Sequence, residues 1–179
     1  ASMAQRLVRA KARIREAGIP FAVPGRAEMG ERLAAVLEAI YAAFAEGWTD
    51  AGGGESRRRN LAGEAIWLGR LAAGLMPDEP EALSLLALML FAESRRTARR
   101  GVDGTYVPLA EQDVRLWDAG MVAEAEALLV RAGELDGLGR YQIEAAVQAV
   151  HAARRLTGRT DWPAVLTLYD ALVSLSVSP

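Results

Sequence analysis

The chain has 179 residues, a length typical of one domain that buries about 70% of the surface its unfolded form exposes. It has 0 Cys, which excludes disulfide frameworks, thiolate zinc sites and cysteine nucleophiles. A hydrophobic content of 51% and a net charge of −2 exclude a wholly disordered chain. The chain has 35 Ala and 23 Leu against 24 Val, Ile and Thr together. Because unbranched side chains lose little rotamer freedom in a helix, we predict an all-α fold.

The hydropathy of the chain indicates no membrane contact. The longest apolar stretch, residues 82–92, is about half the ~20 residues that a transmembrane helix needs, and it predicts a buried core helix. Residues 6–15 are basic, but no uninterrupted apolar segment and cleavage site follow them, so they do not form a secretory signal. We therefore expect a cytoplasmic protein.

The first helix differs in charge from the rest of the chain. Residues 1–16 carry a charge of +4, which leaves −6 for the remainder. A short basic helix beside an acidic body favours a polyanionic partner for that helix, and a solvated helix without a partner is the alternative. Gly18 and Pro20 end this helix, so residues 18–28 are predicted to be a linker. The apolar residues of the helix recur at helical spacing: Leu7, Ala10, Ile14 and Ala17.

Six further amphipathic helices are expected in the region 29–179. Asp78 as N-cap, Pro80 in the first turn and Glu81 at the third helical position mark the start of the fourth helix of the chain, which we expect to reach about Arg100. The short glycine-marked turns predict antiparallel helix pairs, stacked as a degenerate tetratricopeptide-like array or a bundle. The six helices are expected at about 29–46, 61–75, 79–100, 121–135, 139–150 and 161–172.

The sequence offers little chemistry for catalysis. His151 is the only histidine, and its helical, alanine-rich surroundings favour a core or interhelix role over that of a catalytic base. Glu111, Asp113 and Asp118, with Asp103, lack the alternate-residue spacing of a calcium loop, so helix caps and salt bridges are favoured over a metal site. No phosphate-binding loop, dinucleotide fingerprint or nucleophile elbow is present. We expect no enzyme, no metal and no cofactor.

The aromatic residues supply a candidate partner groove. Each of the four tryptophans, taken alone, is expected to pack in the core. As a set with neighbouring polar residues they would line a groove for a peptide, because aromatic anchors supply much of the energy of peptide binding. The candidate groove residues are Trp48, Asp113, Trp117, Asp118, Tyr141, Gln142 and His151.

The order of several motifs resembles one protein family. Residues 5–15, Gln-Arg-Leu-Val-Arg-Ala-Lys-Ala-Arg-Ile-Arg, resemble the C-terminal end of region 4 in extracytoplasmic-function sigma factors. The later segments are similar to the sigma-factor subgroup with a long tetratricopeptide-like C-terminal extension, although Ala45 and Trp48 depart from its pattern. These segments are Ile19-Pro-Phe, Arg32-Leu-Ala-Ala-Val-Leu, Phe44-Ala-Glu-Gly, Met76-Pro-Asp-Glu-Pro-Glu-Ala-Leu, Leu109-Ala-Glu-Gln-Asp-Val-Arg-Leu-Trp-Asp, Tyr141-Gln-Ile-Glu-Ala-Ala and Asp161-Trp.

The resemblance implies that residues 1–17 are the remnant of a recognition helix and that residues 29–179 are the extension. The intact protein would bind RNA polymerase core and promoter DNA, and the extension would contact sigma regions 2 and 4 or a regulator protein. The alternative is a ligand-sensing helical domain of a bacterial transcription regulator, which requires an enclosed apolar cavity of ~300 Å³ or more. The residues that would face DNA or polymerase are Gln5, Arg6, Arg9 and Arg13, with Leu7 packed inside the helix-turn-helix.

Overall fold

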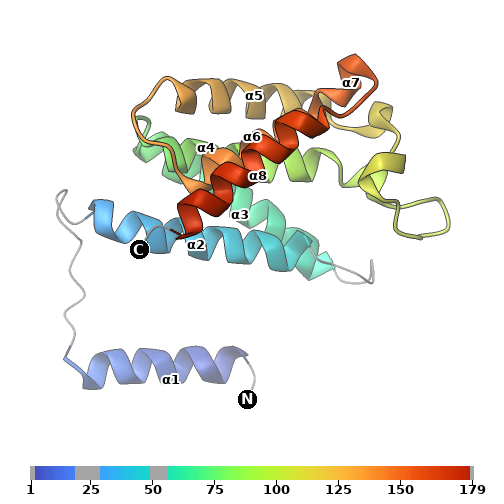
Figure 1. Ribbon diagram of the computed structural model, residues 1–179. Coiled ribbons are helices and arrows are strands. Elements are labelled where there is room, and N and C mark those ends of the chain that lie inside the picture. The colour runs from blue at the N-terminus through green and yellow to red at the C-terminus, as the bar shows by residue number, and fades with distance from the viewer. Residues whose placement is uncertain (1–2, 19–28, 49–55, 178–179) are drawn as a thin grey trace. The chain divides into compact units, whose positions relative to one another are not determined.

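The computed structural model describes residues 3–18, 29–48 and 56–177 (Figure 1). Most of the predicted linker, residues 19–28, therefore lies outside the described residues. The chain divides into two units, residues 1–34 and 35–179. Each unit is described by itself below. For some residues of the described helices the structure describes the backbone alone. These are residues 3–7, 10, 29, 31, 56–60 and 176–177.

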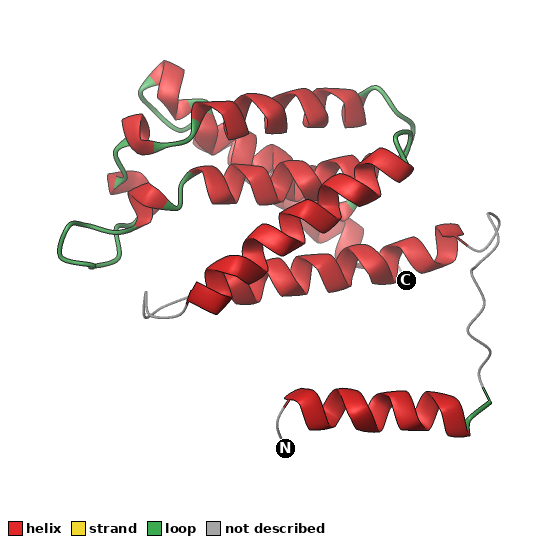
Figure 2. Ribbon diagram, turned by 180° about the vertical axis from the view of Figure 1, so that it is seen from behind, coloured by secondary structure: helices red, strands yellow, loops and turns green. Residues whose placement is uncertain are grey.

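The all-α prediction is confirmed over the described ranges (Figure 2). They contain seven helices of 13 to 20 residues, the one-turn α7 (Arg154–Thr157), three short 3₁₀ turns and one isolated bridge between Arg100 and Tyr106. The 3₁₀ turns are η2 (Thr97–Arg99), η3 (Leu109–Glu111) and η4 (Val114–Leu116). The long helices are α1 (Met3–Glu16), α2 (Met29–Trp48), α3 (Ser56–Leu75), α4 (Pro80–Ser94), α5 (Ala119–Gly133), α6 (Arg140–Ala152) and α8 (Trp162–Val177).

Helix α4 is the core of the second unit. Of its 15 residues, 13 are buried, which agrees with the apolar composition on all its sides because a helix that is hydrophobic all round must be covered. It contacts α3, α5 and α6 (Figure 1). The contact with α3 is close, since a Cβ atom added at Gly69 would come within 2.6 Å of Met89 Cε. The prediction of a buried core helix over residues 82–92 is confirmed.

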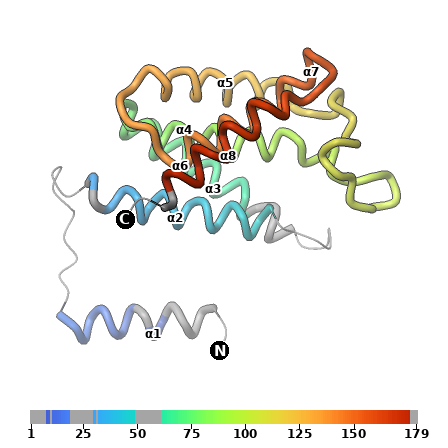
Figure 3. The backbone as a smooth tube through the Cα atoms, viewed as in Figure 1, coloured from blue at the N-terminus to red at the C-terminus, as the bar shows by residue number. Residues whose placement is uncertain are grey.

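Helix α5 runs antiparallel to α4. At one end of α4 the Ser94 carbonyl accepts a hydrogen bond from the Asp118 amide at 2.9 Å, and at the other end Asp78 lies 3.7 Å from Arg131 of α5. Helices α4 and α5 therefore run in opposite directions, as the path of the backbone in Figure 3 shows. Among the described helices, none combines the length and apolar composition that crossing a membrane requires.

Helix α4 ends at Ser94, so its predicted continuation to Arg100 is wrong. The Phe91 carbonyl accepts bonds from Ser94 Oγ at 2.8 Å and from Arg95 Nε at 3.3 Å. The Ser94 carbonyl, which a longer helix would offer to Ala98, is bonded to Asp118 instead. The side-chain bonds to the Phe91 carbonyl and the bond from the Asp118 amide therefore end α4 six residues before the predicted end at Arg100.

Candidate interaction surface

The structure distributes the seven candidate groove residues over several positions. Trp48 ends α2, Trp117 follows η4, and Tyr141 and His151 lie ten residues apart on α6, which corresponds to about 15 Å along the helix axis. His151 and Trp117 are linked through shared arginine neighbours, as described below. Contact of these residues with a partner stays a prediction.

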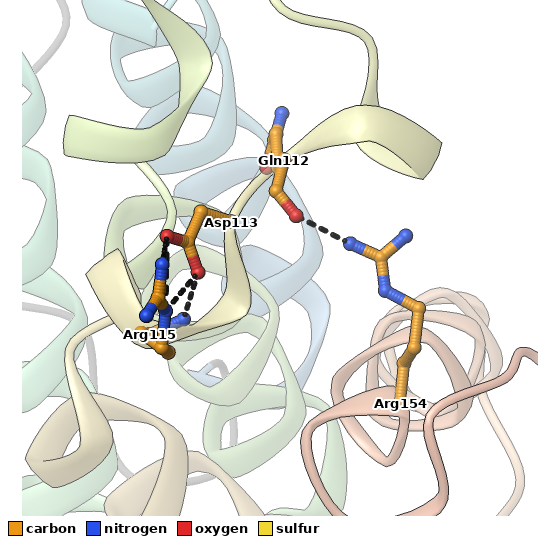
Figure 4. A network of polar contacts seen from close by, with 4 residues as sticks. All are labelled: Gln112, Asp113, Arg115 and Arg154. Carbon is orange, nitrogen blue, oxygen red and sulfur yellow. Dashed lines mark hydrogen bonds and ion pairs between the residues drawn. The ribbon is translucent and has the colours of Figure 1, made fainter.

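Trp117 packs in the protein interior between two arginines. Trp117 is 5% exposed, and the guanidinium carbons of Arg95 and Arg154 lie 5.9 Å and 5.4 Å from its ring centroid. Arg154 donates to the carbonyl of Gln112 at 2.9 Å, as Figure 4 shows, and to that of Ala110 at 2.9 Å. Arg154 thus fixes the loop before α5 against α7. The guanidinium groups of both arginines interact with the aromatic ring of Trp117.

Burial and neighbouring positive charge both act on His151. Burial lowers the pKa of His151, and the charges of Arg95 and Arg154 lower it further. Burial, with the charges of Arg99 and Arg154 acting in the same direction, lowers the pKa of Arg95 to about 10. The His151 ring lies edge-on to Trp162 of α8, with the centroids 5.9 Å apart. The imidazole is therefore a packing group between α6 and α8 that favours its neutral form.

Arg99 is held by a second aromatic cluster. Its guanidinium carbon lies 3.9 Å from the Trp48 ring centroid, and its Nη1 donates to the Trp48 carbonyl at 2.9 Å. Phe44 stacks on Trp48, with the two ring centroids 5.9 Å apart. Tyr106 lies 5.7 Å from the same guanidinium. Arg95, Arg99 and Arg154 were not among the predicted site residues, although Arg95 and Arg99 belong to a basic run that follows the apolar α4.

Tyr141 and Gln142 are positioned by Glu81, which comes from α4. The Glu81 carboxylate accepts the amide of Tyr141 through Oε2 and that of Gln142 through Oε1, each at 3.0 Å. The expected bond from Glu81 back to the start of its own helix is wrong: α4 begins at Glu79 and Pro80 with no side-chain cap. Gly139 precedes α6 and has no side chain to cap it, so Glu81 satisfies these amides instead.

The acidic residues near η4 act as helix caps. Asp113 Oδ1 accepts the Arg115 amide at 2.9 Å, and Asp118 Oδ1 accepts the Met121 amide at 2.9 Å, so the capping interpretation is confirmed for both. Hydrogen bonds from the Arg115 side chain and amide lower the pKa of Asp113 to about 2 (Figure 4). Asp161 caps α8 in the same way, as predicted. No group of three or more metal-ligand side chains occurs in the described part of the chain.

The basic residues of the first unit are only partly described. Arg9 and Arg13 of α1 are exposed. The side chains of Gln5, Arg6 and Leu7 lie outside the described residues. Contact of α1 with DNA or polymerase therefore stays a prediction.

Two helices carry apolar side chains on their outer sides. Along α8, Trp162, Leu166, Tyr169 and Val173 follow a spacing of four, three and four residues and are 51% to 64% exposed. Trp67, Leu71 and Leu75 recur every four residues along α3, and they too are exposed. The expectation that Trp67 and Trp162 pack in the core is wrong, because each helix buries other residues: Ala65 and Ile66 in α3 and Val165 in α8.

A pocket of about 460 Å³ lies between α6 and α8. It opens to solvent, since Val173 and Leu175 in its lining are 59% and 40% exposed. Arg140 and Glu144 form an ion pair of 2.6 Å at its polar side. The pocket is not the enclosed apolar cavity that the ligand-sensing alternative requires.

The comparison with family models shows which family the chain belongs to. Residues 32–133, more than half of the chain, match the model of a family of unknown function (DUF6596). The chain is also 45% identical over 179 residues to an uncharacterized protein, R00370, of Rhizobium meliloti (strain 1021), and spans 42% of the length of that protein. No solved structure matches the chain. The matched region extends from α2 to the end of α5 and includes α4 with the arginines that follow it, and the chain belongs to the DUF6596 family.

Proposed function

We propose that the chain is the C-terminal regulatory, protein-interaction part of an extracytoplasmic-function sigma factor. In the intact protein it would govern how sigma regions 2 and 4 direct RNA polymerase to promoters. The resemblance of residues 5–15 to the end of sigma region 4 supports this proposal, as does the long part of the relative R00370 that the chain does not span. On this proposal the protein works in the cytoplasm, beside RNA polymerase.

The exposed apolar side of α8 is the observation on which the proposal depends most. Its 16 residues include one charged side chain, Asp170, and both the inner and outer sides of the helix are apolar. A helix that is apolar all round is normally covered, and exposed apolar patches with polar surroundings mark protein contacts. Thr167 and Ser174, which flank the outer stripe, already donate to backbone carbonyls at 3.1 Å and 2.9 Å. Both hydroxyl donors would therefore stay hydrogen-bonded when a partner covers α8.

A promoter-reporter assay tests the proposal. The intact protein is compared with a truncation that ends after residue 23 of this sequence, at equal protein levels. We expect promoter activity to change several-fold on truncation, because the extension would no longer contact the sigma regions. Unchanged activity would contradict the proposal.

A matched pair of variants links the assay to the surface of α8. Leu166→Ser with Tyr169→Ser removes the centre of the outer stripe, and Thr167→Ala alters the same helix outside the stripe. We expect the first variant to reproduce the effect of truncation and to lose capture of sigma regions 2 and 4 in a pull-down. The second should behave as the unaltered protein.

A further inference from the structure

Three arginines from different elements meet where α4 ends. Arg95 follows α4, Arg99 lies in η2 and Arg154 begins α7. Arg95 interacts electrostatically with both other guanidinium groups, so the three form one region of positive charge, here called the arginine cluster. Within the described part of the chain, none of the three forms an ion pair. The nearby carboxylates of Glu93 and Asp113 are bonded to Arg96 and Arg115.

The acceptors of the arginine cluster are neutral. Arg95 donates to Gln148 Oε1 at 2.6 Å and to the Phe91 carbonyl, and Arg154 donates to two backbone carbonyls. Arg99 donates to the Trp48 carbonyl and also bonds the neutral side chain of Tyr106. A guanidinium group has five N–H donors, so these bonds leave donors on each arginine. Part-burial of three like charges with neutral acceptors costs free energy that an anionic partner would recover.

Aromatic rings hold the arginine cluster in position before any ligand arrives. The Trp117 ring lies beside both Arg95 and Arg154, and the Trp48 ring lies 3.9 Å from the guanidinium carbon of Arg99. A guanidinium that is already oriented loses less entropy on binding a carboxylate, which it can bind through two parallel hydrogen bonds. The buried indole N–H of Trp117 also has no acceptor among the described residues. Tryptophan and arginine are the residue types that dominate protein-binding energies.

We propose that the arginine cluster binds carboxylate side chains of an acidic peptide segment in a protein partner. Residues 17–179 carry a net charge of −6, so this part of the protein as a whole repels a long polyanion such as nucleic acid, while a short acidic segment needs only the local positive charge. The inference deepens the proposed function, on which it depends for the protein nature of the partner.

The test is a titration of the 179-residue protein with fluorescein-labelled hexaglutamate, followed by fluorescence anisotropy. We expect saturable binding that weakens about tenfold or more in Arg95→Gln with Arg154→Gln. Arg70→Gln is the matched control, because Arg70 lies on α3 and is paired with Glu124. Arg99→Lys keeps the charge and removes the planar fork, so binding should weaken by less than in the double variant. Thermal melts followed by circular dichroism establish that each variant is folded.

Several results would overturn the inference. They are the absence of saturable binding, an equal effect of Arg70→Gln and the double variant, tighter binding of a hexathymidine oligonucleotide, and displacement of hexaglutamate by inorganic phosphate at equal concentration. If the double variant does not fold, the difference between Arg99→Lys and Arg70→Gln decides. Hexaglutamate binding with no effect of truncation on the promoter would refute the proposed function and keep the carboxylate site. An effect of truncation on the promoter without hexaglutamate binding would refute only this inference.

Discussion

Glu81 joins two helices through its carboxylate. It accepts two backbone amides at the start of α6, each at 3.0 Å, from a position in the first turn of α4. Bonds from backbone amides to a carboxylate are charge-assisted and stronger than neutral ones. We expect Glu81→Ala to lower the free energy of unfolding by about 1–3 kcal/mol, measured by urea denaturation. Glu79→Ala is the control, and an equal loss there would show that the cap of α6 contributes nothing.

Gly139 is required by the same contact. Its φ of −118° suits any residue, but a Cβ atom there would lie 2.1 Å from Glu81 Cδ, so an added methyl group must displace the carboxylate. Gly139→Ala should therefore destabilise the protein about as much as Glu81→Ala does. A double-mutant cycle checks the cause: in the Glu81→Ala background the glycine substitution should cost little. Additive losses would mean that the two residues act independently.

His151 makes stability depend on pH. Because burial and the neighbouring arginines lower its pKa in the folded protein, the unfolded chain binds a proton more readily. The resulting stability is complete above the unfolded pKa of about 6.5 and is lost as the pH falls toward and below the folded pKa. We expect the urea midpoint to fall less between pH 7.5 and pH 5 in His151→Gln than in the unaltered protein. An identical fall in both would contradict this role.

At the residue scale, local contacts were predictable and distant ones were not. The caps by Asp118 and Asp161 connect residues three positions apart, so sequence spacing alone predicts them. The bond from Glu81 to α6 spans 60 residues, and no spacing rule indicates that an uncapped helix lies nearby. The arginine cluster was missed for the same reason, since Arg154 reaches the others only through the fold.

At the scale of elements, α4 and α8 differ in what covers them. Leu85 in α4 is 0% exposed and Leu166 in α8 is 64% exposed. Leu85→Ala should lower the free energy of unfolding by about 2–5 kcal/mol, because it leaves a cavity in the core. Leu166→Ala should change it by about 0.5 kcal/mol or less. Similar losses in urea denaturation would indicate that α8 is already covered.

Helix positions and types were predicted well because hydrophobic periodicity reports a helix directly. Periodicity does not reveal which of two apolar sides is covered when a helix has both. For α3 and α8 the tryptophans were assigned to the core, whereas Trp67 and Trp162 lie on the exposed sides. The end of α4 was also missed, because the carbonyl of Ser94 is taken by a residue 24 positions later.

At the scale of the whole molecule, the exposed apolar sides of α3 and α8 should serve binding and not folding. Trp67→Ser with Leu166→Ser should leave the free energy of unfolding within about 0.5 kcal/mol of the unaltered value. The same variant should capture several-fold less of sigma regions 2 and 4 in a pull-down, with Arg70→Gln as the control. A variant that melts early yet still captures its partner would reverse this assignment.

The bonds between the Glu81 carboxylate and α6 affect where a stable fragment of the protein can end. The segment that matches the family model stops at Gly133, seven residues before α6 begins. A fragment cut there would lose the two amides that bond to Glu81 and the helix that packs against α4. We therefore expect a fragment that ends at the family boundary to be less stable than one that extends through α6.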